Sequence, residues 1–373
     1  MARVVFTTLT VCCSCMPLPI LSTVSLPVAG EEETIKIGSH IKMIDYLLTG
    51  PANVDHASEQ RRTALEGRVG GHMRFASVRT RSDLQPGVLD DGEIVLIGDL
   101  FADLTALIEA GPEGRDAARA ATGDRGRMRV AAAEADLAAP ITRFKRDVLC
   151  TGWNYWDHFE EGKGRRNGQE VDRPTAPTFF TKSPNAVIGP LDAIAWDARC
   201  SKKWDYEAEL ALVIGKPGRS IPAGRAHEHI FGYCLANDVS QRDIQRRHGG
   251  QWMRGKSADQ TAPLGPHLVT PDEIEDLGAI RIECELNGEV MQSAPIAQMA
   301  FDIPTLIAEL SFGMTLNAGD LLLTGTPAGV GNARTPQVFL KPGDMVVTRA
   351  TGLGELRNTI EERDLYGDAE IEL

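Results

Sequence analysis

The sequence has few aromatic residues and no surplus of positive charge. Phe, Trp and Tyr make up 6% of the 373 residues, and the formal net charge is −13. Proteins that bind nucleic acid usually carry a basic surface, often with aromatic side chains on which bases stack, so this composition argues against such a partner. An acidic chain is equally poorly suited to an anionic membrane surface. We therefore expect neither nucleic acid nor a membrane as a partner.

The sequence also lacks the motifs and long apolar runs of several large protein classes. It contains no GxGxxG and no P-loop. The apolar stretch near the start is interrupted by Pro17, Pro19 and several Ser and Thr residues, so it is unsuited to a membrane span. The seven cysteines are odd in number, and those in the body of the chain are widely spaced, which favours reduced thiols over a disulfide framework. We expect a cytoplasmic protein.

Residues 1–72 precede what reads as the natural start of a domain. From Met73, MRFASVRTRSDLQPGVLDDGEIVLIGDL opens directly on a strand and a hairpin. We interpret residues 1–72 as an N-terminal extension that is disordered or not part of the native domain, as an incorrect start site would produce. An export signal stays an alternative, because Arg3, an apolar stretch and the small residues Val28-Ala29-Gly30 follow in the order of a signal peptide.

Strand and turn signals dominate the chain from Met73 onward. Asn287-Gly288 lies between two strand-like segments, RIECEL and EVMQ, and predicts a two-residue hairpin turn. Helix signals are few: FADLTALIEAG begins near Asp103, and FDIPTLIAELS has Asp302 as its expected N-cap. Strands and helices do not alternate regularly. The sequence therefore predicts a mainly β fold with a few helices (α+β).

The same signals suggest a division into two parts. Residues 73–140 combine short strand-like runs with one helix and predict a small β-rich N-terminal domain. An Ala- and Arg-rich segment then leads to the larger part, and we expect the catalytic domain over residues 146–373.

One segment contains charges that a buried strand should avoid. WDYEAELALVIG, residues 204–215, reads as a single strand with an apolar run, yet Glu207 and Glu209 point to the same face. An exposed edge strand would explain one such pair. A third carboxylate, Asp238, ends the apolar segment GYCLAND. Three carboxylates without a nearby His or Cys cluster suit a hard divalent cation, Mg²⁺, Mn²⁺ or Ca²⁺, and not zinc. Such a cation would also neutralise the like charges.

A possible acid–base pair lies upstream of these carboxylates. His158 and Glu161, in WNYWDHFEE, have the spacing of one helical face. A carboxylate at that spacing can orient an imidazole that acts as general base, although such pairs are more often surface contacts. The next segment, GKGRRNGQEVDRPTAP, is charged and contains glycine. It is typical of a hinged loop over a pocket or of an ordinary solvated loop.

These segments together resemble the fumarylacetoacetate hydrolase superfamily over residues 146–360. The matching stretches occur in the family's order: CTGWNYWDHFEE, PTFFTKSPNAVIGP, DYEAELALVIG, GYCLANDVSQRDIQ, GGQWMRGKSAD, PLGPHLVT, NGEVMQ, LLLTGTPAGVG and TGLGELRNTI. The resemblance implies a catalytic domain with a mixed β-sandwich or β-roll of that family's type. It also implies a homodimer.

The resemblance implies roles for individual residues. A metal ion, Mg²⁺ or Mn²⁺ with Ca²⁺ also possible in chemical terms, would be held by Glu207, Glu209 and Asp238. His158 and Glu161 would form the catalytic pair on a mobile short helix, and Lys256 would face a carboxylate or enolate oxygen of the substrate. The expected substrate-binding residues are Arg242, Gln245, Thr326 and Lys182, of which Lys182 is equally well explained as structural.

The implied chemistry acts on a keto acid bound to the metal. Our main hypothesis is a metal-dependent hydrolase that cleaves a C–C bond in a diketo acid such as an acylpyruvate or fumarylpyruvate, as in the catabolism of aromatic compounds. The alternative is an isomerase, tautomerase or decarboxylase on the same scaffold, acting on oxaloacetate or 2-hydroxyhepta-2,4-diene-1,7-dioate. A protein that only binds a keto acid is less well supported, since every expected catalytic position is filled.

Overall fold

The structure is a computed structural model of the chain and describes residues 23–25, 34–36, 72–166 and 170–367. The chain divides into two units, Met1–Gly70 and Gly71–Leu373. In the first unit, β1 (Thr23–Ser25) pairs antiparallel with β2 (Thr34–Lys36). The rest of the extension expected over residues 1–72, except His72, lies outside the described residues.

The second unit is built mainly from strands, which confirms the predicted fold class. Its large sheet contains twelve strands within the described residues. Most pairs of adjacent strands in this sheet are antiparallel. In order across the sheet these are β6 (Arg129–Ala131), β5 (Glu93–Leu96), β4 (Leu84–Asp90), β3 (Arg74–Arg79), β17 (Ala262–Val269), β15 (Ile230–Asn237), β13 (Ala208–Ile214), β21 (Leu321–Leu323), β8 (Val148–Gly152) and β9 (Thr178–Lys182), with β7 (Leu137–Ala138) on β3 and β10 (Val187–Ile188) on β17.

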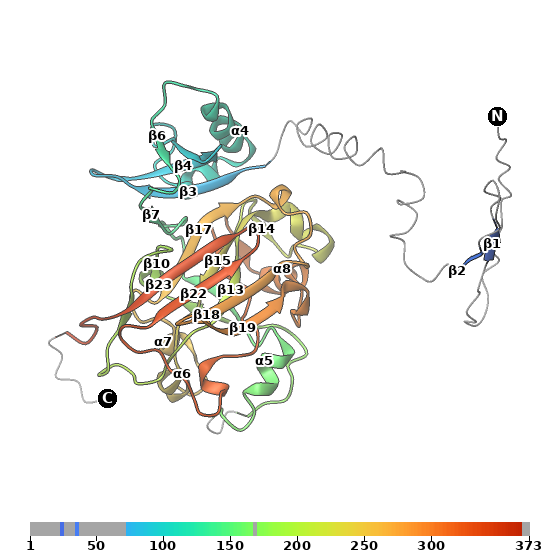
Figure 1. The fold of residues 1–373 in the computed structure, drawn as a ribbon, viewed down its shortest axis with the longest axis vertical. Coiled ribbons are helices and arrows are strands. Elements are labelled where there is room, and N and C mark those ends of the chain that lie inside the picture. The colour runs from blue at the N-terminus through green and yellow to red at the C-terminus, as the bar shows by residue number, and fades with distance from the viewer. Residues whose placement is uncertain (1–22, 26–33, 37–71, 167–169, 368–373) are drawn as a thin grey trace. The chain divides into compact units, whose positions relative to one another are not determined.

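A second sheet lies against the large one and encloses the main core. Its strands are β11 (Ile194–Trp196), β23 (Gly354–Glu362), β22 (Met345–Ala350), β18 (Arg281–Leu286) and β19 (Glu289–Pro295). Ile282 and Leu356 from this sheet belong to the same buried cluster as Leu210 and Leu235 from the large sheet. Figure 1 shows β22, β23 and β18 crossing β13 and β15. Two short pairs complete the strands: β12 (Trp204–Asp205) with β16 (Ser240–Gln241), and β14 (Gly218–Arg219) with β20 (Thr315–Leu316).

β13 is an interior strand, paired with β15 on one side and β21 on the other, and both of its faces are buried. Leu210 and Leu212 contribute to the core between the sheets, whereas Ala211 and Val213 contribute to a second cluster that contains Leu104 of α3 (Leu104–Glu109). Burial on both faces explains the uninterrupted apolar run. The expectation of a single strand over residues 204–215 is wrong: β12 and β13 pair with different partners and are separated at residues 206–207.

The local predictions for helices and the hairpin are confirmed. Asp103 caps α3 by accepting a hydrogen bond from the Ala106 amide at 2.7 Å. Asp302 caps α8 (Ile303–Ser311) in the same way. Asn287 and Gly288 connect β18 to β19 with φ values of 53° and 86°, the left-handed region that this turn requires. The other α-helices of the described residues are α4 (Gly111–Thr122), α5 (Trp156–Glu161), α6 (Arg242–Arg247) and α7 (Met253–Lys256).

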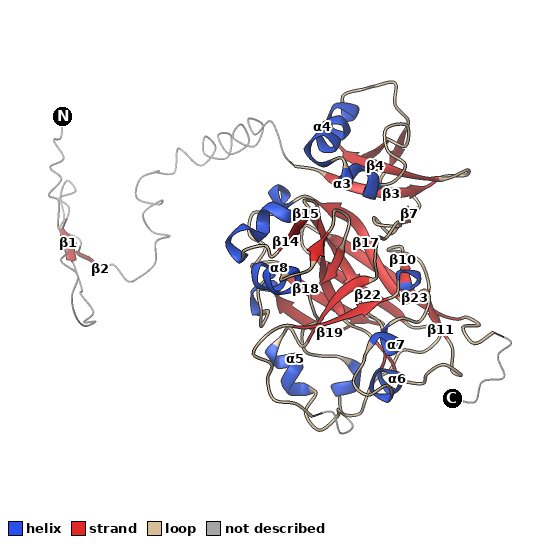
Figure 2. Ribbon diagram, turned by 180° about the vertical axis from the view of Figure 1, so that it is seen from behind, coloured by secondary structure: helices blue, strands red, loops and turns tan. Residues whose placement is uncertain are grey.

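Three of these helices lie at one end of the second unit. Figure 2 shows α5, α6 and α7 gathered at the same end of the sheets, and the view of Figure 1 agrees. No helix in the described part of the chain combines the length and apolar character needed to cross a membrane. The proposed boundary between residues 73–140 and 146–373 stays a prediction; β3 from the first range pairs with β17 from the second.

The stability of the second unit should depend on pH through His267 of β17. Burial, followed by the charge of Arg74, lowers the pKa of His267 from 6.5 to about 4. Between these values the unfolded chain binds a proton that the folded chain does not, so stability falls as the pH decreases through this window. His267→Gln should remove up to ~3 kcal/mol of that dependence, measured by urea unfolding at roughly pH 7.5 and 4.5.

His227→Gln is the matched control, because the His227 side chain is exposed. The control should keep the wild-type dependence on pH. If the free energy of unfolding changed equally with pH in the wild type and in His267→Gln, the pH dependence could not be attributed to His267.

Candidate active site

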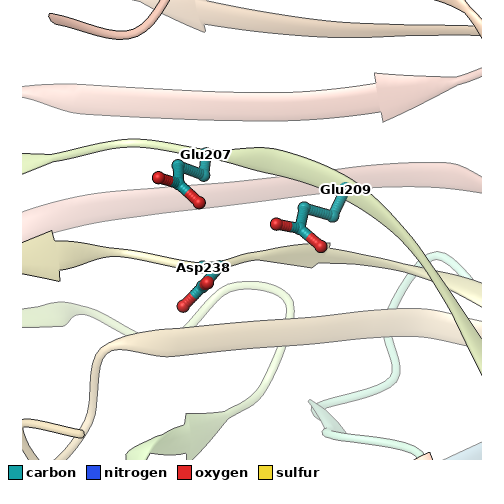
Figure 3. Close-up of side chains that lie close together, drawn as sticks. All are labelled: Glu207, Glu209 and Asp238. Carbon is teal, nitrogen blue, oxygen red and sulfur yellow. The ribbon is translucent and has the colours of Figure 1, made fainter. Parts of the chain in front are cut away.

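Three carboxylates converge where β12 leads into β13 and where β15 ends. The register pairs Ala208 with Asn237, so Glu207 lies opposite Asp238, and Glu209 follows one pleat further on. One oxygen from each carboxylate lies within 4.8 Å of the others. Figure 3 shows the three side chains around one space. Each is at most 5% exposed, so the edge-strand explanation for the two glutamates is wrong.

The three carboxylates have different electrostatic surroundings. Burial raises the pKa of Glu209 well above its ordinary value, and the charges of Asp238 and Glu207 raise it further. Burial acts in the same direction on Glu207, but Lys256 and then Arg242 outweigh it and hold the pKa of Glu207 below its usual range. Glu209 accepts a hydrogen bond from the Gly325 amide at 2.7 Å and forms no ion pair within the described residues.

Cationic side chains compensate the other two carboxylates. Lys256 Nζ lies 2.7 Å from Glu207 Oε2 and 2.7 Å from Asp238 Oδ2. Lys182 Nζ lies 2.9 Å from Asp238 Oδ1, and Arg242 Nη1 lies 2.6 Å from Glu207 Oε1. Of the three carboxylates, Glu209 alone forms no ion pair within the described residues. Three buried oxygen ligands, one of them uncompensated, fit a hard divalent cation.

His158 and Glu161 lie on α5 and form the expected pair. His158 Nδ1 is 2.7 Å from Glu161 Oε1, and Glu161 Oε2 accepts a hydrogen bond from the Gly329 amide at 2.8 Å. The carboxylate therefore holds the imidazole and also ties α5 to the glycine-rich segment GTPAGVG. Gly329 has φ +111°, and an added Cβ would lie 2.0 Å from the Met291 carbonyl oxygen, so only glycine fits there.

A cavity of about 50 Å³ brings most of the predicted residues together. Its lining includes Glu207 of the carboxylate group and six further predicted residues: His158, Glu161, Arg242, Gln245, Lys256 and Thr326. Glu209, Asp238 and Lys182 do not line it but are connected to it through the contacts described above.

Two predicted substrate-binding residues already have structural partners. The Thr326 hydroxyl donates to the Ala208 carbonyl at 2.9 Å and accepts from Gln292 Nε2 at 2.8 Å. Lys182 is fully buried, and its Nζ also donates to the Val239 carbonyl at 2.9 Å. The structure therefore favours the structural explanation for Lys182. A substrate contact by Thr326 stays a prediction.

The sequence reasoning missed Asp205, a central polar contact of the site. Asp205 Oδ2 accepts from Arg242 Nε at 2.8 Å and from the Asn332 amide at 3.0 Å, and Oδ1 accepts from the Gly331 amide at 2.7 Å. It thus fixes α6 and the end of the GTPAGVG segment to β12. The signal was present: Asp205, Glu207 and Glu209 alternate along WDYEAE.

A group of aromatic rings around α5 was also missed. Trp153 makes edge contacts with Phe159 and Trp252, at centroid distances of 5.6 and 4.7 Å. The Arg166 guanidinium lies 4.1 Å from the Phe159 ring centre and donates to the Phe159 carbonyl. Trp153, Trp252 and Arg166 all line the cavity, so this group closes it on the side of α5.

The match to a family model agrees with this site. The model described as fumarylacetoacetate (FAA) hydrolase C-terminal matches residues 147–361, which contain every predicted site residue. The chain belongs to this family, and the resemblance expected from its sequence is confirmed.

Two similar proteins carry the name of one reaction. The chain is 44% identical over 227 residues to the oxaloacetate tautomerase YisK of Bacillus subtilis, a match that covers 61% of this chain and 73% of the relative. It is also 44% identical over 228 residues to a human mitochondrial oxaloacetate tautomerase, covering 61% of this chain and 70% of the relative.

Solved structures of the same fold carry more varied names. A fumarylacetoacetate hydrolase from Exiguobacterium antarcticum aligns with a TM-score of 0.66 and 35% identity, covering 78% of this chain and 100% of its own. A maleylpyruvate hydrolase from Sphingobium, solved with manganese(II) and pyruvate, aligns with a TM-score of 0.62 and 26% identity, covering 78% and 99%. A 2-hydroxyhepta-2,4-diene-1,7-dioate isomerase from Mycobacterium marinum also aligns, with a TM-score of 0.59 and 28% identity, covering 78% and 99%. The fold therefore occurs with both hydrolase and isomerase names.

Glu209→Gln should abolish metal binding without unfolding the chain. Glutamine can still accept the Gly325 N–H, and no cation of the described residues loses a partner. We expect the Mn²⁺ affinity to fall at least about 100-fold in calorimetric titration. Glu289→Gln, at an exposed position of β19, is the control and should bind Mn²⁺ like the wild type. Unchanged affinity in Glu209→Gln would remove Glu209 from the metal site.

Gly152→Ala should disturb the aromatic group. A Cβ at Gly152 would lie 2.2 Å from the Trp252 ring, so the indole must move out of the cavity wall. We expect a loss of ~1–3 kcal/mol in the free energy of unfolding and reduced turnover. Gly224→Ala is the control, because nothing lies within 4 Å of its added Cβ. Wild-type stability and turnover in Gly152→Ala would show that Trp252 moves freely.

Proposed function

We propose that this protein is a metal-dependent tautomerase of a 2-keto dicarboxylate, with oxaloacetate as its substrate. The observation that carries the proposal is the 44% identity over 227 residues to an oxaloacetate tautomerase. This differs from our main expectation of a C–C hydrolase and corresponds to the alternative. The site geometry supports it, because interconverting keto and enol forms requires only proton transfer at a stabilised enolate.

The residues of the cavity have separate roles in that proton transfer. A bound divalent cation would supply positive charge that stabilises negative charge on the 2-keto oxygen. His158 has its Nδ1 engaged by Glu161, so Nε2 is the nitrogen available to take a proton from C3 of the substrate. Two of the three ammonium hydrogens of Lys256 are used by Glu207 and Asp238, and the third can reach a substrate oxygen.

The remaining residues orient the substrate and exclude water. Gln245 accepts a hydrogen bond from Arg242 at 3.2 Å, which leaves its amide N–H groups for a substrate carboxylate. Trp153 and Trp252 cover one side of the cavity. A small, aromatic-lined cavity suits a compact acid and disfavours attack by water, which a hydrolase requires.

A C–C hydrolase is the second candidate. It is favoured by the fold's similarity to a maleylpyruvate hydrolase, whose structure holds manganese(II) and pyruvate. The products distinguish the two reactions, since hydrolysis of a diketo acid consumes water and yields two acids. Tautomerisation in D₂O exchanges hydrogen at C3 of oxaloacetate and leaves its carbon skeleton intact, whereas decarboxylation releases CO₂. Metal-loaded protein should catalyse the exchange, and a chelator should abolish it.

His158→Ala should stop turnover while leaving the metal site intact. The imidazole is the proposed base, so kcat for enol–keto conversion, followed by ultraviolet absorbance, should fall about 10²–10⁴-fold. The Mn²⁺ affinity should stay nearly unchanged, because His158 forms no hydrogen bond with the three carboxylates within the described residues. Glu161→Gln should cause a smaller loss in kcat. Retention of most of the activity in His158→Ala would overturn the proposed role of His158.

A further inference from the structure

A second cavity lies behind the wall of the active site that α6 forms. It has a volume of about 200 Å³ and shares Arg242, Arg246 and Asn332 with the active-site cavity. We call it the basic cavity; its other lining residues are Gly164, Arg165, Lys203 and Gln337. This volume exceeds the ~30 Å³ that one water molecule occupies in the liquid, so a small anion can fit.

All four charged residues that line the basic cavity are cations, although the whole chain has a net charge of −13. Arg165 donates to the Asn332 carbonyl at 3.2 Å and to the Thr335 hydroxyl at 2.7 Å, both of which are neutral. Lys203 forms no ion pair with a carboxylate in the described part of the chain. Positive charge in this cavity is therefore only partly compensated by the protein.

Arg242 provides an independent indication of a ligand. It is 5% exposed, and its Nε and Nη1 are paired with Asp205 and Glu207. Its third guanidinium nitrogen, Nη2, is buried and has no hydrogen-bond partner within the described residues. A buried charged donor without an acceptor is costly, so its place in the wall shared by the two cavities points to an acceptor from a bound molecule.

The neighbouring arginine supports the same conclusion. Burial, followed by the charges of Arg242 and Arg166, lowers the pKa of Arg246 to about 10. The charges of Glu170 and Asp205 offset only part of these effects, and an anion beside Arg246 would oppose them further.

We propose that the basic cavity binds a small doubly charged oxyanion, either free phosphate or a dicarboxylate, through Arg165, Lys203 and Arg246. Charge-assisted hydrogen bonds from guanidinium and ammonium groups recognise such anions. Arg165 follows the helix that carries His158, and Arg246 is next to Gln245. The bound anion therefore joins two segments that form walls of the active site.

The test uses the full-length, metal-loaded protein at constant ionic strength. Inorganic phosphate and malonate are titrated separately by calorimetry into wild type, Lys203→Gln and Lys202→Gln. Lys203 lines only the basic cavity, whereas the neighbouring Lys202, exposed like Lys203, lines neither cavity. Lys203→Gln should weaken binding about tenfold, and Lys202→Gln should leave it unchanged. Binding of phosphate alone identifies the free ion, and binding of malonate alone identifies a dicarboxylate.

Glu209→Gln tests whether the anion binds in the basic cavity or at the metal. The variant should bind the anion as the wild type does, because Glu209 does not line the basic cavity. Loss of binding in Glu209→Gln together with retention in Lys203→Gln would place the anion on the metal and overturn the proposal. Equal weakening by Lys202→Gln and Lys203→Gln, or no binding of either anion, would also overturn it. Since binding is measured without turnover, these failures leave the proposed tautomerase activity untouched.

Discussion

The burial of three like charges between hydrogen-bonded strands is the constraint on which the rest of the site depends. An uncompensated buried carboxylate is costly, so cationic side chains must approach from other elements. Glu207 and Asp238 receive theirs from β9, α6 and α7, which explains why these short elements lie against the ends of β13 and β15. Glu209 receives only a backbone N–H. The resulting asymmetry makes the position beside Glu209 the natural place for a cation.

The sequence reveals chemistry well when its residues are close along the chain. His158 and Glu161, and likewise Glu207 and Glu209, are separated by one helical or strand repeat, so their proximity follows from local geometry. The interruption of the strand at residues 206–207 could not be predicted, because it depends on β12 pairing with β16 rather than on local preference. The partners of Thr326 also come from distant segments, so no local sequence pattern predicts them.

The reaction class was the hardest feature to predict, for a physical reason. A chelated keto acid beside a general base can be hydrolysed, isomerised or decarboxylated, and the shared motifs provide only the chelate and the base. What separates these outcomes is access of water and the shape of the cavity walls, which Trp153, Trp252 and Arg166 form. Those side chains come from three segments and lie outside the carboxylate pattern. Relatives at 44% identity therefore say more about the reaction than the motifs do.

The contacts of α5 have a consequence for how the chain assembles. The carboxylates and Lys256 lie within about fifty residues of one another, whereas Glu161 reaches Gly329 across 168 positions and Arg165 reaches Thr335 across 170. Closing long loops carries a larger entropic cost, so distant contacts tend to form late in folding. We therefore expect the segment that holds Glu207, Asp238 and Lys256 to organise before α5 docks. The cation can enter before the docking of α5 restricts its path.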